Sequence, residues 1–119
     1  DGFRHCPAPM DSHSGFGEEV AFIDPYGDKE QQVVCGYVND QLGLGLKISF
    51  SKTQLPWLIH WQHWGKNEYV TALEPATNPP IGQAAARENE SLILLEPGES
   101  RTYDLRLSIF LGDAAREFS

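Results

Sequence analysis

The sequence predicts an all-β protein whose strands pair antiparallel. Short segments rich in β-branched, aromatic or alternating apolar residues recur along the chain, and turns containing Gly, Pro or Asn separate them. No segment keeps a helical period for long. The connections between the expected strands are short, which favours antiparallel pairing, because a parallel pair needs a crossover of about a dozen residues or more.

The first half of the chain is expected to hold an irregular lead-in over residues 1–17 and then four strands. The clearest pattern lies at residues 44–51, where apolar side chains alternate with small or polar ones, as in a strand buried on one face. In the next strand the alternation places Trp61 and His63 on one face and His60 and Trp64 on the other. The four expected strands cover residues 19–23, 32–38, 44–51 and 57–64.

Three more strands are expected in the second half of the chain, at residues 69–74, 91–95 and 102–111. Residues 65–67, Gly-Lys-Asn, form a hairpin-like link into the first of them. The long connection that follows this strand has room for one helical turn, at residues 84–88. The last strand carries its apolar residues on one face and Asp104, Arg106 and Ser108 on the solvent face. The tail, residues 112–119, is expected to be frayed or to form one short helical turn.

The composition describes a single folded domain with an acidic surface. Hydrophobic residues make up 40% of the chain and aromatic residues 11%, as in globular proteins. The formal net charge of −8 repels phosphates, so nucleic acid and anionic membranes are poor partners. No apolar run approaches the roughly 20 residues that a membrane-spanning helix needs.

The N-terminus and the cysteines bear on the compartment of the protein. The chain begins at Asp1 with neither an initiator Met nor a charged, apolar leader, so we expect a cytoplasmic protein of which this is a processed form or a piece. Cys6 and Cys35 permit one disulfide in principle, but two isolated thiols in such a protein are more often reduced. We expect Cys35, in a strand-like segment, to be a small buried apolar residue.

Residues 69–75, with the sequence YVTALEP, single out Glu74 as the candidate functional group. The alternation places Val70, Ala72 and Glu74 on one face, and Pro75 ends the ladder because it has no N–H to donate. Glu is depleted in strands and costly to desolvate, so a carboxylate that ends an apolar face is unusual. The alternative is that Glu74 is one of the many strand-end carboxylates that simply lie in water.

The stretch at residues 69–82, YVTALEPATNPPIG, and the later LEPGES at 95–100 resemble the C-terminal end of the galactose mutarotase-like (aldose 1-epimerase-like) superfamily. The closest likeness is to its uncharacterised bacterial branch of predicted epimerases. That branch is also matched by residues 15–22, 42–46 and 54–57, with Trp61. The resemblance runs roughly from residue 15 to residue 111. It implies an antiparallel β-sandwich, the C-terminal part of a larger supersandwich, so that residues 1–119 form one partial domain.

The resemblance also implies a mechanism. In mutarotases the Glu of the Leu-Glu motif, here Glu74, is the general base that takes the proton of the sugar's anomeric hydroxyl, while a His protonates the ring oxygen. The family's catalytic histidines lie upstream of the matched portion, so this piece alone should lack the general acid and be inactive. A sheet cut from a larger sandwich keeps unpaired strand edges and an uncovered apolar face, so we expect self-association through sheet edges.

Two tryptophans and one arginine are the candidate substrate-binding residues. Trp61, at the family's tryptophan position, or Trp64 would offer a flat face to sugar C–H bonds, unless these rings only fill the core. Arg87 follows the Glu74 loop and would bind a hydroxyl or a phosphate. The alternative for Arg87 is an ion pair in solvent with Glu88 or Glu90.

The histidines give no catalytic partner and no metal site. None of the four histidines lies in a motif that aligns with the family's catalytic ones. His60 and His63 fall on opposite faces of their strand, so they cannot act as adjacent ligands. We expect neither a metal nor a cofactor.

Two functions therefore remain open. The first is an aldose 1-epimerase-like isomerase with an aldose as its ligand, of which this chain is the C-terminal portion. The rival is a non-catalytic β-sandwich that binds sugar or serves only as an interaction module. A metal-dependent enzyme is disfavoured by the positions of the histidines.

Overall fold

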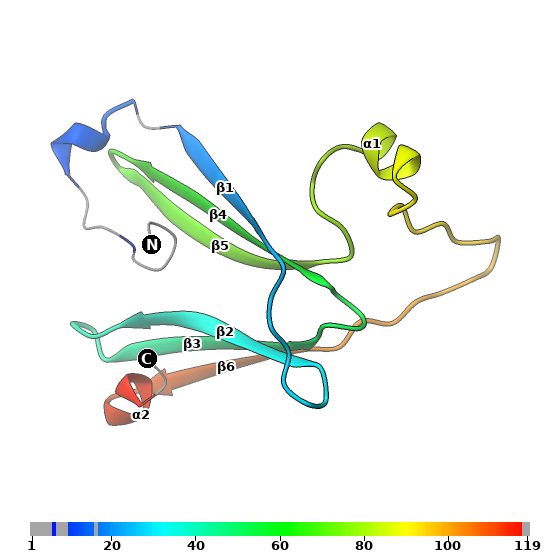
Figure 1. The fold of residues 1–119 in the computed structure, drawn as a ribbon. Helices are drawn as coiled ribbons and strands as arrows, with labels where there is room; N and C mark the ends of the chain where they lie inside the picture. The colour runs from blue at the N-terminus through cyan, green and yellow to red at the C-terminus, as the bar shows by residue number, and fades with distance from the viewer. Residues whose placement is uncertain (1–5, 7–9, 16, 118–119) are drawn as a thin grey trace.

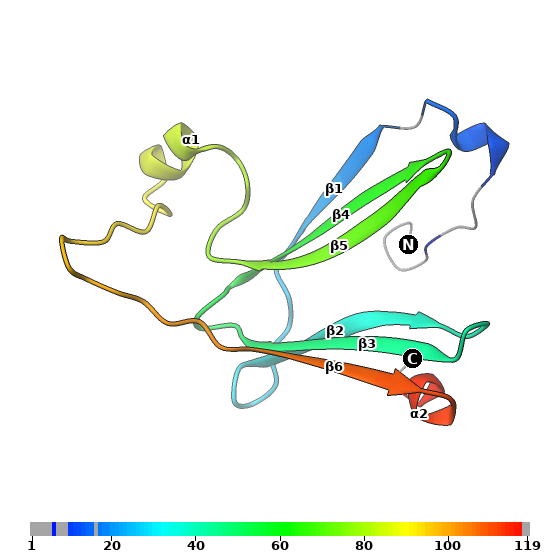
Figure 2. The ribbon, with the colours of Figure 1, turned by 180° about the vertical axis from the view of Figure 1, so that it is seen from behind.

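The computed structural model describes residue 6 and residues 10–15 and 17–117, and these form two antiparallel sheets of three strands each (Figure 1). The first sheet has the order β1 (Glu18–Ile23), β4 (Trp57–Gly65) and β5 (Glu68–Ala76). The second has the order β2 (Gln32–Asn39), β3 (Leu44–Ser51) and β6 (Leu105–Leu111). Figure 2 shows the same two layers from behind. The expected antiparallel β-sandwich is confirmed.

Short helices account for the rest of the regular structure in the described part of the chain. A 3-10 turn, η1 (Asp11–His13), lies within the lead-in, of which residues 1–5, 7–9 and 16 are outside the described residues. The expected helical turns in the long connection and in the tail are present as α1 (Gln83–Glu88) and α2 (Asp113–Arg116). Among the described residues, no helix is long and apolar enough to cross a membrane.

The hairpin between β4 and β5 sets the register around Glu74. Two residues, Lys66 and Asn67, join the strands, and Asn67 adopts a φ of 67° that Asn tolerates better than most residues. The register then places Glu74 opposite Ile59 and Leu73 opposite His60. Because partners in a ladder point to the same side, the alternation predicted for both strands is confirmed.

The core lies between the two sheets. Five buried apolar residues form it, and Ile23, Cys35 and Leu73 pack against them. Phe50, on β3, is the largest of them and is almost completely buried. The five buried residues are Val33, Ile48, Phe50, Leu55 and Leu58. Figure 1 shows the sheets close together near the connection from β3 to β4 and apart toward their other ends.

One expected strand is absent. Residues 91–95 form no strand in the structure, and β6 begins at Leu105 and not at residue 102. Leu94 and Leu95 are instead exposed, in a long irregular connection between α1 and β6. A strand needs a neighbour that takes up its backbone hydrogen bonds, and the sequence pattern of this segment could not show that none is available. The prediction of a seventh strand was wrong.

The apolar face of β6 is uncovered. Leu107, Ile109 and Leu111 are 67%, 70% and 72% exposed, because the facing sheet of three strands does not extend over them. β6 is also an edge strand, since among the described residues it pairs only with β3. The unpaired edge and the uncovered face that the family resemblance implied are both observed.

Candidate functional site

Glu74 lies near the end of β5 and points away from the core. Its neighbour Leu73 packs against the core, so the alternation of the strand turns the Glu74 carboxylate to the outer face of the first sheet. We call this outer face the Glu74 face. Glu74 is exposed there, and it lines none of four hollows formed by the described residues, including the two that lie between the sheets. The described residues therefore do not enclose the carboxylate, and its role as a base stays a prediction.

The Glu74 face is largely apolar and partly aromatic. The ladder registers of β1, β4 and β5 place apolar side chains on it beside the carboxylate. Several of them, including Val20, Phe22 and Val70, are exposed. The apolar members of the face are Val20, Phe22, Trp57, Ile59, Trp61, Val70 and Ala72. An apolar surface beside a carboxylate can stack on the C–H face of a sugar and accept a hydrogen bond from a hydroxyl.

Trp61 is held in place on this face by Glu18, a residue for which the sequence analysis found no role. Its indole Nε1 donates a hydrogen bond of 2.8 Å to Oε2 of Glu18, on the neighbouring strand β1. Its ring also stacks on that of His63, with 6.2 Å between centroids and 17° between the planes. Only the pairing of β1 with β4 reveals this role of Glu18, because 43 positions separate the two residues in the chain.

The other two candidate binding residues lie elsewhere. Trp64 is on the inner face, 5% exposed, and its ring lies 4.6 Å from that of Tyr69. Arg87 is in α1, which stands beyond the end of β5 (Figure 1). Its side chain is exposed, and within the described residues it forms no ion pair with Glu88 or Glu90. The structure thus brings Trp61 to the face of Glu74 and separates Trp64 and Arg87 from it.

The described histidines do not supply an acid beside Glu74. His60 is buried on the inner face, while His63 shares the outer face and lies 3.4 Å from Oε2 of Glu68. His63 pairs with Val70, four positions from Glu74, which puts roughly 13 Å of strand between them. His5 is outside the described residues. No group of three or more His, Cys, Asp or Glu in the described chain could hold a metal ion.

A polar cluster occupies the space between the sheets. The hydroxyl of Thr71 donates to the carbonyl of Trp61 at 2.8 Å, so its oxygen can only accept from its other two neighbours. These are the phenol of Tyr37 at 2.9 Å and Nε2 of His60 at 3.1 Å. Burial raises the pKa of Tyr37, which favours the protonated phenol that donates to Thr71.

Both cysteines are free thiols. Cys35 borders a hollow of about 330 Å³ between the sheets, together with Cys6, Tyr37 and His60. Burial raises the pKa of Cys35 to about 11, so its thiol stays protonated at neutral pH. An unreactive, half-buried Cys35 agrees with the structural role expected for it.

Comparison with known proteins agrees with this architecture. Residues 1–109 match the family model described as a domain of unknown function, DUF4432. The fold is similar to the crystal structure of a putative aldose 1-epimerase from Klebsiella pneumoniae, with a TM-score of 0.79 and 29% identity over 88% of this chain. The chain spans 28% of the length of that protein. No curated protein matches the chain. Because the family model covers most of its length, this chain belongs to the DUF4432 family.

Proposed function

We propose that the chain is the sugar-binding part of an aldose 1-epimerase-like isomerase and that it contributes the general base, Glu74. The observation that supports this most strongly is the similarity to the Klebsiella protein over 88% of the chain. The position of Glu74 agrees with the proposal, because a base for a sugar must be reachable from solvent and lie beside an apolar surface.

The proposed chemistry is a proton transfer in each direction. Glu74 takes the proton of the anomeric hydroxyl, and a general acid protonates the ring oxygen as the C1–O5 bond breaks. Rotation about C1–C2 and closure on the other carbonyl face return both protons and give the other anomer. No described histidine stands beside Glu74 on its face of the sheet, so we propose that the acid comes from a longer protein that contains this chain.

Trp61 is the proposed stacking platform for the sugar ring. It shares the Glu74 face, pairs with Ala72 two positions from Glu74, and is oriented by Glu18. An indole presents a rigid apolar plane to sugar C–H groups, while its N–H stays bonded to a carboxylate. Glu74 and Trp61 would then contact one bound aldose.

The test of the base follows anomer exchange by NMR in a longer protein that contains this chain. Glu74→Gln should lower the exchange rate at least about a hundredfold, because it removes the general base but keeps the shape of the side chain. Glu96→Gln is the matched control, since Glu96 belongs to a second Leu-Glu-Pro triplet and is also exposed. Equal rates for the wild type and Glu74→Gln would exclude Glu74 as the base.

A non-catalytic sugar-binding or structural module is the second candidate. The exposure of Glu74 favours it, because none of the four hollows described above includes the carboxylate, and a catalytic site usually encloses its substrate. Sugar binding without anomer exchange in the longer protein would support a binding module. The absence of both would leave a structural role.

A further inference from the structure

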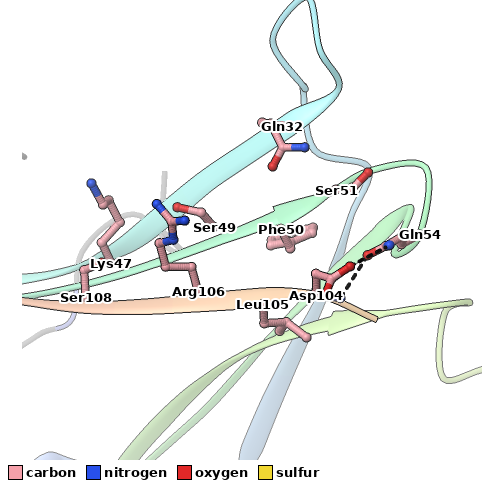
Figure 3. Close-up of a pocket in the computed structure, with 10 residues that line it drawn as sticks. All are labelled: Gln32, Lys47, Ser49, Phe50, Ser51, Gln54, Asp104, Leu105, Arg106 and Ser108. Carbon is pink, nitrogen blue, oxygen red and sulfur yellow. Dashed lines mark hydrogen bonds between the residues drawn. The ribbon is translucent and has the colours of Figure 1, made fainter. Parts of the chain in front are cut away.

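A polar hollow of about 770 Å³ lies on the outer face of the second sheet, the side of the sandwich away from the Glu74 face. Figure 3 shows the lining residues, which come from β2, β3 and β6 and from the segments next to these strands. Ten residues line it: Gln32, Lys47, Ser49, Phe50, Ser51, Gln54, Asp104, Leu105, Arg106 and Ser108. Seven of them carry an amide, a hydroxyl or a positive charge, so the hollow is suited to a polar ligand.

The register of β3 and β6 brings two cations together in this hollow. Lys47 pairs with Ser108, and Ser49 pairs with Arg106, so the two cations occupy diagonal positions on one face of the sheet. Figure 3 shows both side chains standing on the same side, with Ser49 beside them. Diagonal neighbours on a sheet are within reach of long side chains, and like charges at that range repel. An anion bound at this place would be attracted by both charges.

No described residue balances the charge of Arg106. Among the described residues its guanidinium forms no ion pair and no hydrogen bond. The nearest carboxylate along its strand, that of Asp104, accepts a hydrogen bond of 3.2 Å from Nε2 of Gln54. The Gln54 oxygen in turn accepts from the backbone N–H of Asp104 at 3.0 Å, which fixes this pair at one end of the hollow.

Lys47 lies at the other end of the hollow. Its ammonium lies 4.8 Å from the ring centre of Phe110, in a cation–π contact that restricts the side chain. Gly36 pairs with Lys47 on β2 and has no side chain to fill the space beside it. The floor between the two cations consists of small hydroxyl residues, Ser49 and Ser108.

We propose that this hollow binds the phosphate group of a small, hydroxyl-bearing phosphate ester. Arg106 and Lys47 hold the phosphate oxygens, since a guanidinium can bind two of them at once and an ammonium adds a point charge. The serine hydroxyls, Gln32 and the Asp104–Gln54 pair bind the ester's hydroxyls. The net charge of −8 does not prevent this, because solvent ions screen charges beyond about 8 Å. The site is independent of the function proposed for Glu74.

The test titrates the chain with three probes: inorganic phosphate, a hexose 6-phosphate and the same unphosphorylated hexose. Backbone amide shifts in NMR locate the binding, and calorimetry gives the Kd. The hexose phosphate should bind at least as tightly as phosphate, with a Kd of about 1 mM or lower, and should shift the amides of Ser49 and Ser108. The free hexose should leave those two amides unchanged.

Charge-matched variants make the result specific. Arg106→Gln and Lys47→Gln should each weaken binding of the hexose phosphate about tenfold or more, since each removes a charge-assisted hydrogen bond. Arg101→Gln changes the net charge equally, but Arg101 is exposed and lies outside the hollow, so its Kd should equal that of the wild type.

Three outcomes would overturn the proposal. The first is no binding of the hexose phosphate at about ten times the expected Kd. The second is an equal loss of affinity in Arg101→Gln and Arg106→Gln, which would indicate a general charge effect. The third is binding whose amide shifts lie on the Glu74 face and not around Ser49 and Ser108. If Lys47→Gln fails to fold, Arg106→Gln decides alone, because the guanidinium of Arg106 is exposed and forms no ion pair or hydrogen bond with the described residues.

Discussion

The side-chain oxygen of Thr71 lies 2.9 Å from the phenol oxygen of Tyr37, and this hydrogen bond connects the two sheets. Thr71 belongs to β5 and Tyr37 to β2, 34 positions earlier in the chain. The same hydroxyl bonds His60 and the carbonyl of Trp61 within its own sheet. A single small side chain thus satisfies three polar groups between the layers, where an unpaired one would be costly.

We expect Thr71→Val to destabilise the protein by about 1–3 kcal/mol, because it keeps the shape of the side chain but leaves the partners of its hydroxyl unpaired. The measurement is the denaturant midpoint. Thr102→Val, at an exposed position with no side-chain hydrogen bond, is the control and should stay within about 0.5 kcal/mol of the wild type. Equal midpoints for Thr71→Val and Thr102→Val would mean that the cluster adds nothing to stability.

The thiol of Cys35 should react slowly near neutral pH. Burial raises its pKa to about 11, so thiolate forms only as the pH rises, and its alkylation rate should increase about tenfold per pH unit up to that value. A Cys6→Ser variant isolates Cys35, and mass spectrometry follows the reaction. In the unfolded chain the same thiol should titrate near its ordinary value of 9.0.

The raised pKa of Cys35 also makes the stability of the fold depend on pH. The folded state holds the thiol proton more tightly than the unfolded state, so this contribution to stability is complete below pH 9.0 and is lost as the pH rises to about 11. Equal alkylation rates of Cys35 in the native and the unfolded protein at pH 8 would contradict the burial of this thiol.

Sugar binding on the Glu74 face should depend on Trp61 and, through it, on Glu18. Trp61→Ala should abolish saturation-transfer signals from a bound aldose, since it removes the stacking plane. Glu18→Ala should weaken binding several-fold, because the indole loses the carboxylate that orients it at 2.8 Å. Trp57→Ala tests whether another aromatic of this face can substitute, and unchanged signals in Trp61→Ala would contradict the platform.

The free edge of β6 is suited to a second copy of this chain. Antiparallel pairing of two β6 strands about Ser108 would place Leu107 opposite Ile109 of the other copy and Arg106 opposite Phe110, so no like charges meet. It would also join two uncovered apolar faces into one. In natural proteins Lys, Pro or a bulge usually prevents an edge strand from pairing with another chain. β6 contains none of these within Leu105–Leu111.

We therefore expect the chain to self-associate and Ile109→Lys to make it monomeric. In the paired state the charged lysine side chain would be buried on the apolar face without an opposite charge beside it, which is costly. Leu42→Lys is the matched control, because Leu42 is equally exposed, at 73%, but lies in the β2–β3 turn. Light scattering after size exclusion measures the mass. A wild-type chain that remains a monomer at high concentration would refute the prediction.

Much of the local structure could be predicted from the sequence. The period-two patterns of Leu44–Ser51 and Trp57–Gly65 gave the strands and their faces, and Gly65-Lys66-Asn67 gave the hairpin. The segment at 91–95 has the same apolar character and is not a strand. The difference is the presence of a pairing partner, which a local pattern does not contain.

The sequence alone determined which side chains of each strand share a face, including that of Glu74 with Val70 and Ala72. That result follows from the geometry of the extended backbone, in which neighbouring side chains point to opposite sides. Only the tertiary structure decided that Glu18 bonds Trp61, that Tyr37 bonds Thr71 and that Lys47 and Arg106 take diagonal positions on one face. Those contacts depend on which strands pair and on which sheets stack, and so on the free energy of the whole assembled sandwich.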